Sequence, residues 1–243
     1  MSSDSSSKEI FSFHLVHLSF FSILAYFFRP LHKRNIPGIR HSESFFVMNL
    51  GEGVFSFKRF NLGSCGFFIW WDEDAHIDQL TEQPRYSFFR DDGWQIRIKK
   101  YRRWGGVREI NDAHIDPSLR DPENPVVAVT LARLKLWHLL RFTKWGKPVE
   151  RQVRDHRGNT LALAAFRPFN HFCTFSIWNT EAEMTGMVFG KRSAEDGDEH
   201  KRAMKERNRK AFHFEFATMR FVPTKQLGAW NGKSDHVNPA SSE

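Results

Sequence analysis

The sequence of 243 residues is poor in cysteine and in tyrosine, with two and three residues, respectively. Cys65 and Cys173 lie far apart and form neither a CxxC pair nor a disulfide framework. On their apolar flanks they are expected to be buried, unreactive side chains. This cysteine usage is typical of a reducing compartment, so the expected location is cytoplasmic.

Motifs of the common catalytic machineries are also missing from the sequence. There is no HExxH motif, no clustered Cys/His set, no P-loop, no GxGxxG and no GxSxG elbow. Gly51-Glu52-Gly53 is too short for a nucleotide-binding loop, and it predicts a tight turn or a close backbone approach to a bulky ligand. Hydrolysis and phosphoryl transfer are therefore not indicated, whereas a borrowed cofactor is compatible with the sequence.

The net charge is +8, but acidic residues interrupt the basic ones. No RNP or zinc-finger pattern accompanies them, so we expect solvated helix faces and no nucleic-acid partner. Residues 11–28 carry no formal charge and reach the length of a short membrane span. Histidines and serines dilute this run, and it is expected to belong to the folded domain, with peripheral contact to the inner membrane as the alternative.

Phenylalanine and tryptophan are abundant, with 25 and 8 residues. These side chains carry large apolar surfaces and predict a wide core or a pocket for a flat apolar ligand. Residues 64–80 align without a gap on residues 172–188, which pairs Cys65 with Cys173 and Trp70 with Trp178. An internal repeat of this kind indicates that one unit occurs twice.

Each half is predicted to have the order β-α-β-β-α-β, the ferredoxin-like arrangement. The fold class is therefore α+β, with tandem ferredoxin-like repeats packed as a dimeric-type α/β barrel within one chain, helices outside and an apolar pocket between the sheets. In the second half the pattern predicts strands at 126–133, 161–166, 172–178 and 212–221, and helices at 136–157, from Thr180, and at 200–210. The expected organisation is a tail (1–9), the first repeat (10–116), a linker (117–125), the second repeat (126–230) and a second tail (231–243).

Histidines are the main candidates for polar chemistry. His14 and His17 lie on one predicted strand and should point to opposite faces. His138, His156, His171 and His213 have no spacing partner that indicates zinc, and His213 is expected to pack on its sheet. Trp104 and Trp230 close the two halves and are expected to plug the barrel.

Several segments together resemble the spheroidene monooxygenase family, of which the chain would be a divergent member. The resemblance extends from about residue 11 to residue 230 and rests on VMNLGEGVFSF (47–57), FFIWWDEDAH (67–76), RRWGG (102–106), VTLARLKLWHLLRF (129–142), FSIWNTEAEM (175–184) and HKRAMKERNRKAFHFEFATMRF (200–221).

This resemblance implies a haem-dependent monooxygenase that introduces oxygen into a carotenoid or a similar long apolar substrate. It implies haem iron as cofactor, with O2 and an external electron-donor protein as partners. His200 falls on the family's axial iron ligand and Arg207 is the expected propionate partner, with Lys201 as the alternative. Catalytic residues are not assigned, and the sequence leaves the oligomeric state open.

Two other functions fit the same sequence. The barrel could bind or sense a hydrophobic ligand without catalysis. It could also be a cofactor-independent small-barrel monooxygenase, which needs only one or two polar groups in the pocket, and His14, His17 and Asn49 are the candidates for that role.

Overall fold

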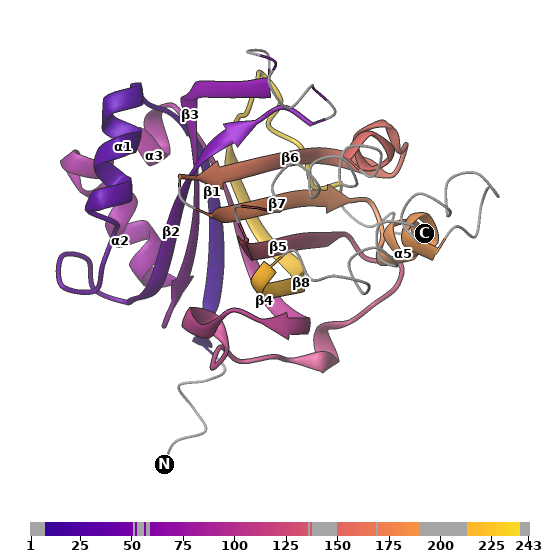
Figure 1. Ribbon diagram of the computed structural model, residues 1–243. Coiled ribbons are helices and arrows are strands. Elements are labelled where there is room, and N and C mark those ends of the chain that lie inside the picture. Colours follow the sequence, from indigo (N-terminus) through magenta and orange to yellow (C-terminus); the bar gives the residue numbers. More distant parts are fainter. Residues whose placement is uncertain are drawn as a thin grey trace.

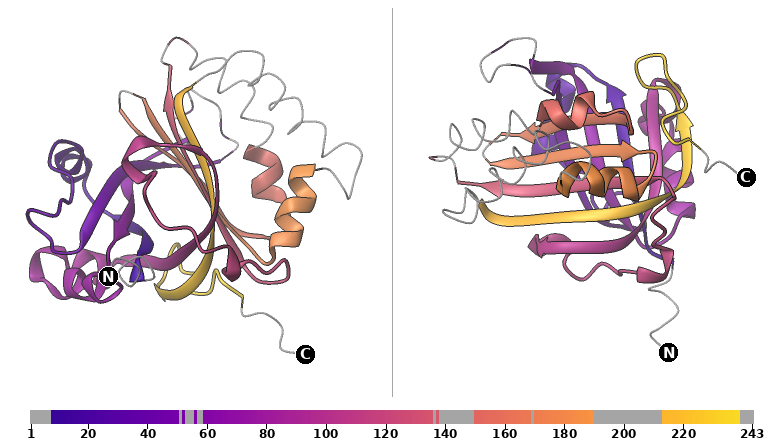
Figure 2. Two further views of the ribbon diagram at one scale, coloured as in Figure 1. Left: turned by 90° about the horizontal axis from the view of Figure 1, so that it is seen from below. Right: turned by 90° about the vertical axis from the view of Figure 1, so that its right-hand side faces the viewer.

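The computed structural model describes residues 8–50, 52, 56, 59–135, 137, 150–168, 170–189 and 213–238. Their eight strands form one closed antiparallel barrel, in the order β1-β3-β2-β6-β7-β5-β8-β4 (Figure 1). The views of Figure 2 show helices on the outside of both halves, with α1, α2 and α3 on one side and α5 on the other.

The elements of the first half are β1 (Ile10–His17), α1 (Phe20–Phe28), β2 (Ile39–Met48), β3 (Phe60–Trp71), α2 (Ala75–Glu82), η3 (Pro84–Tyr86), α3 (Phe88–Asp91) and β4 (Gly93–Gly106). Two short 3-10 turns follow, η4 (Arg108–Ile110) and η5 (Pro117–Leu119). The elements of the second half are β5 (Val126–Leu134), β6 (Asn159–Arg167), β7 (His171–Trp178), α5 (Glu181–Phe189) and β8 (His213–Gly228).

Strand order is the same in the two halves. The first half runs β4-β1-β3-β2 and the second runs β8-β5-β7-β6, both antiparallel throughout. This is the sheet order of the ferredoxin-like arrangement. The halves meet at two seams: β4 pairs with β8 along a long ladder, whereas β2 pairs with β6 only from Phe46 to Met48.

The residue-by-residue alignment of the repeat is wrong by one position. Neighbouring residues on a strand point to opposite faces, so equivalent residues must share a face. Cys65 packs beneath the helices of the first half, whereas Cys173 points into the barrel. The ladders instead make Trp71 equivalent to Trp178, because each lies opposite the first residue of the first strand of its half.

The interior of the barrel is a packed core to which all eight strands contribute. Phe13 of the first half stacks on Phe175 of the second, with ring centroids 4.0 Å apart. Trp94 meets Phe175 edge to face, with centroids 6.1 Å apart. Side chains therefore fill the space between the sheets, and the expectation of a shared apolar pocket there is wrong for the described residues.

The outer face of the first half-sheet is covered by α1, α2 and α3. Ile23 and Phe27 of α1 and Phe89 of α3 pack on Phe67 and its neighbours in a second apolar core. The α1 helix begins after Ser19, whose hydroxyl accepts a hydrogen bond from the amide of Ser22 at 3.2 Å. It ends before Pro30, which cannot continue the hydrogen-bond ladder. No helix among the described residues is long and apolar enough to cross a membrane.

The other sequence-based element predictions have mixed outcomes. The four strands of the second half are confirmed, and the Thr180 hydroxyl caps α5 by accepting a hydrogen bond from the Glu183 amide at 3.0 Å. Of the helix predicted at 136–157, residues 150–155 are helical, whereas residues 136 and 138–149 lie outside the described residues. The helix predicted at 200–210 also lies outside them, within the segment 190–212. Trp230 is buried and plugs the barrel as predicted, but Trp104 is 40% exposed.

Replacing the two stacked rings tests whether the halves share one core. Phe13→Leu and Phe175→Leu should each lower the free energy of unfolding by about 1–3 kcal/mol, measured by urea denaturation. Because the rings touch, the double variant should deviate from additivity by about 0.5–1.5 kcal/mol. Phe13→Leu with Phe89→Leu, whose rings lie on opposite sides of the sheet, is the control and should be additive. Additivity of the Phe13 and Phe175 changes would contradict a shared core.

Candidate functional site

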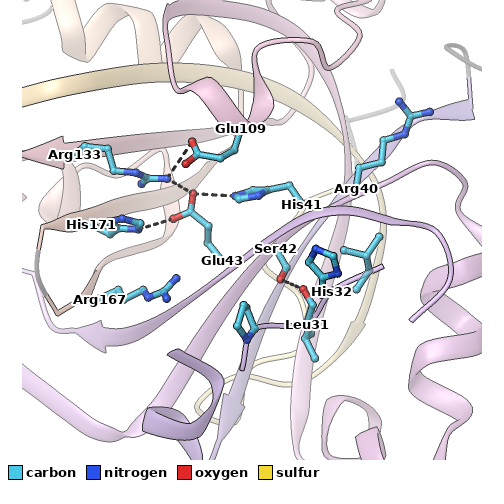
Figure 3. Close-up of a pocket in the computed structure, with 12 residues that line it drawn as sticks. Leu31, His32, Arg40, His41, Ser42, Glu43, Glu109, Arg133, Arg167 and His171 are labelled. Atoms are coloured by element: carbon cyan, nitrogen blue, oxygen red, sulfur yellow. Dashed lines mark hydrogen bonds and ion pairs between the residues drawn. The ribbon is translucent and has the colours of Figure 1, made fainter. Parts of the chain in front are cut away.

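A polar pocket of about 230 Å³ opens at one end of the barrel, beside the short β2–β6 seam. Before Phe46, strand β2 is no longer paired with β6. The inward-facing residues in the first part of β2 therefore lie next to the β6–β7 turn and the end of β5 (Figure 3). The pocket is lined by Pro30, Leu31, His32, Ile39, Arg40, His41, Ser42, Glu43, Glu109, Arg133, Arg167 and His171.

Glu43 is the centre of this pocket, with 1% of its surface exposed. Its Oε1 accepts hydrogen bonds from Arg133 Nη2 at 2.6 Å and from His41 Nε2 at 3.2 Å. The Nδ1 atom of His171 lies 3.3 Å from the other carboxylate oxygen, at ion-pair distance but outside hydrogen-bond geometry. Arg133 and His171 belong to the second half, so this carboxylate joins the two halves across the seam (Figure 3).

The Glu43 carboxylate is held in its charged form. Burial alone would raise its pKa, but contacts with His171, His41 and Arg133 outweigh that effect and hold the pKa well below its usual value. Arg133 is itself buried and also lies 3.7 Å from Glu109 Oε2. The cluster therefore compensates two buried charges by pairing, as buried charges require.

The pocket also presents donors that are not used by the cluster. Arg133 Nη1 is buried and has no hydrogen-bond partner among the described residues. Arg167 donates to the carbonyl of Phe27 at 2.5 Å, and burial, together with the nearby Arg133, lowers its pKa. These groups suit a small polar ligand that accepts hydrogen bonds. Within the described residues, no group of three or more His, Cys, Asp or Glu side chains is arranged to hold a metal ion.

A second surface with a distinct character lies on the outer face of the second half-sheet. Two rows of small side chains cross its strands, side by side in the ladders. The first row contains Ala164, Thr174, Thr130 and Thr218, and the second contains Ala162, Ser176 and Ala128. We call these seven residues the small-residue floor.

The small-residue floor contrasts with the equivalent face of the first half-sheet. There, Phe46, Phe67 and Trp71 are buried beneath helices. On the second half-sheet, Met184 and Met187 of α5 pack against Trp178. Val153 and the floor residue Ala128 pack against the same apolar cluster. Thr130, whose hydroxyl lies 3.2 Å from that of Thr218, remains partly exposed. The outer face of this half-sheet therefore carries small side chains where that of the first half carries large ones. Six floor residues are partly exposed, whereas Ala164 is fully buried in an apolar cluster with Met48 and Phe172.

The residues nominated from the family resemblance, His200 and Arg207, lie outside the described residues, and so does the alternative Lys201. Of the Gly51-Glu52-Gly53 segment, only Glu52 is described.

The polar groups considered for a cofactor-independent reaction are not brought together. His14 is fully buried beneath α3, and its Nε2 lies 2.8 Å from the Ser12 hydroxyl. Burial, and to a smaller extent the positive charge of Arg97, lowers the pKa of His14 to about 3. His17 lies on the opposite face and stacks on Trp230 at 4.6 Å, which confirms the predicted divergence of the two histidines. Asn49 is exposed at the end of β2.

The sequence interpretation missed the Glu43 cluster. A signal was available in the sequence. Glu43 is the only charged residue in SESFFVM (42–48), and Arg133 is the only charged residue in VTLARL (129–134). A single charge on the inward side of a strand is rarely buried without a partner of opposite sign. His171 was considered only as a zinc ligand, and its partner is a carboxylate from the other half.

Comparisons with known proteins support the fold. No known family and no curated protein sequence matches this chain. Among solved structures, an aldoxime dehydratase in complex with butyraldoxime is 8% identical with a TM-score of 0.53, over 95% of this chain and 86% of that one. A second aldoxime dehydratase is 7% identical with a TM-score of 0.54, over 90% and 83%.

Other solved structures match with lower TM-scores. A monooxygenase-like protein from Listeria innocua is 8% identical with a TM-score of 0.30, over 91% of this chain and 97% of that one. The two aldoxime dehydratases thus establish that this eight-strand barrel fold occurs in known enzymes, and at these identities the likeness shows the fold alone.

Removing the charge of Glu43 tests the role of the cluster. Glu43→Gln leaves Arg133 without its carboxylate and should lower the free energy of unfolding at pH 7 by about 3–5 kcal/mol. Because the folded-state pKa is depressed, this contribution is present above the ordinary glutamate pKa and is lost as the pH falls through the folded-state value.

Urea denaturation at several pH values measures both effects. The difference between wild type and Glu43→Gln should shrink as the pH falls below about 4.5. Glu109→Gln is the matched control, since Glu109 is more exposed and farther from Arg133, and its cost should stay below about 1 kcal/mol. An equal, pH-independent cost for both substitutions would contradict this account.

Proposed function

We propose that this protein is a haem-dependent monooxygenase that acts on a carotenoid or a similar long apolar substrate. Two observations support the proposal: the resemblance of six segments to the spheroidene monooxygenase family, and a barrel fold that known enzymes share. The observation that carries it is the small-residue floor on the outer face of the second half-sheet.

In the proposal, the small-residue floor is the surface against which a porphyrin lies. Its first row spans four neighbouring strands, and at about 4.8 Å between strands this is roughly 14 Å. Alanine, serine and threonine rise little above a sheet. In the proposal the macrocycle lies parallel to the six floor residues that are partly exposed, beside the buried Ala164. The Thr130 and Thr218 hydroxyls pair with each other, and the Ser176 hydroxyl accepts a hydrogen bond from Trp178 Nε1 at 2.9 Å.

The proposed ligands come from the connection that leads to this face. Residues 190–212 join α5, which packs on the outer face, to the start of β8, which belongs to the same sheet. In the proposal, His200 in this connection holds the iron and Arg207, or alternatively Lys201, pairs with a propionate. Haem bound there would supply O2 activation with electrons from an external donor protein.

The remaining residues have supporting roles in the proposal. The small-residue floor excludes water from one side of the ring and fixes its plane. The apolar core packs the barrel interior, so in the proposal the substrate approaches from the helix side of the second half. This arrangement also disfavours the alternative of a ligand-binding barrel whose ligand occupies the interior.

Absorption spectroscopy of protein expressed with a haem supply tests the proposal. Wild type should show a Soret band, and His200→Ala should lose it or shift it to that of weakly bound haem. Thr174→Trp, which raises a large side chain from the floor, should weaken haemin binding at least tenfold. Ala182→Trp is the control on the exposed side of α5 and should bind as wild type does.

Two outcomes would contradict the proposal. A folded wild-type protein that takes up no haemin would exclude haem as cofactor. Equal haemin affinity of Thr174→Trp and wild type would place the haem away from the small-residue floor. If haem binds, turnover of a carotenoid with an electron-donor system then tests the substrate class.

A further inference from the structure

The α1 helix has two apolar sides, although only one of them is buried. Ile23 and Phe27 pack into the core of the first half. On the outward side, Phe21 is 80% exposed and Phe28 is 76% exposed. Residues seven apart lie on the same face of a helix after two turns, so the two rings point outward together. Partly exposed Phe20 lies beside them, and its ring meets that of Phe21 edge to face.

This aromatic face is unusual for a soluble surface. Single exposed apolar residues are common, but a cluster of exposed large aromatics on one short helix marks an interaction surface. Figure 1 shows α1 at the outer edge of the first half, and no described element covers its outward side. The helix is held from below by its buried side chains and by the Ser19 cap, so the aromatic face is presented on a fixed support.

Positive charge surrounds this aromatic face. The chain has no aspartate or glutamate between Glu9 and Glu43. Within that interval, Arg29, Lys33 and Arg34 are exposed in the turn directly after α1. None of these three residues has an ion pair with a carboxylate among the described residues. The surface therefore combines aromatic rings with unpaired cations, a pattern that matches an anionic lipid interface.

We propose that α1 and the turn at residues 29–34 dock this protein onto an anionic lipid bilayer. Phe21 and Phe28 would enter the boundary between headgroups and acyl chains, and the three basic side chains would contact lipid phosphates. A basic side chain near an anionic surface strengthens binding by about fivefold. The proposal concerns the first half of the barrel and does not depend on haem binding by the second half.

The charge pattern favours a membrane over a protein groove. A protein partner for an aromatic helix face needs a matching apolar groove, which nothing on this surface specifies. Binding to a bilayer surface needs only apolar rings that reach the boundary between headgroups and acyl chains, with basic side chains beside them. Both are present. The helix has nine residues, which is too short to cross a bilayer and suits an orientation parallel to its surface.

Vesicle flotation tests the proposal with the full chain. Wild type should float with vesicles of phosphatidylcholine containing phosphatidylglycerol, and not with pure phosphatidylcholine. The variant Phe21→Ser/Phe28→Ser should bind at least tenfold more weakly, with unchanged thermal unfolding, because both rings are exposed. Phe214→Ser is the matched control, since Phe214 is 61% exposed in the second half, and its binding should be that of wild type.

A charge variant and a depth probe sharpen the test. Lys33→Gln/Arg34→Gln should weaken binding about twenty-fivefold at low salt, and added salt should reduce the difference. Phe28→Cys carrying an environment-sensitive dye should shift to shorter emission wavelength on anionic vesicles. Cys65 and Cys173 are buried and free, so labelling is selective for the introduced thiol.

Three results would overturn the proposal. One is absence of wild-type flotation with anionic vesicles. Another is equal binding of wild type and Phe21→Ser/Phe28→Ser. The third is a concentration-dependent dimer that the same double substitution dissociates, because the aromatic face would then be an interface between two copies of this chain.

Discussion

The structure depends on the burial of two inward sheet faces against each other. Each half-sheet has helices on one side only, so its other face would be exposed to water if the half stood alone. Phe13 on Phe175 and Trp94 against the same ring join the halves into one interior. Closure also removes free sheet edges, since the long β4–β8 ladder and the short β2–β6 ladder complete the barrel.

The short β2–β6 seam accounts for the charged cluster. The main-chain ladder ends after three residue pairs, and the inward-facing Glu43 beyond it meets Arg133 and His171 of the other half. Side-chain pairing thus continues the contact between the halves where main-chain pairing stops. The closed interior has a second consequence, because it confines any site for a large ligand to the outer faces or the ends of the barrel.

The two outer faces have diverged, and this difference carries the functional account. In the first half, large side chains fill the space between sheet and helices, and α1 turns a further aromatic face outward. In the second half, the outer face carries two rows of alanine, serine and threonine. In the two proposals, the first of these faces contacts lipid and the second holds a flat cofactor.

Strand positions and their order were predictable from the sequence. Alternating apolar residues mark a strand and glycine or proline marks a turn, and both are local signals. The register of the repeat was not predictable, since Cys65 and Cys173 stand in similar letter contexts but face opposite sides of their sheets. The packed interior was also missed, because aromatic abundance does not distinguish a core from a pocket. Within the Glu43 cluster, Arg133 lies 90 positions from Glu43 in the chain and His171 lies farther still, and barrel closure brings them together.

The central claim is that the second half-sheet holds a flat cofactor on its outer face. Hydrogen–deuterium exchange with and without added haemin tests it most directly, because it locates the ligand on the protein. The account predicts new protection of amides in β5–β8 and in residues 190–212, with β1–β3 unchanged. Protection confined to the first half, or no change on addition of haemin, would contradict it.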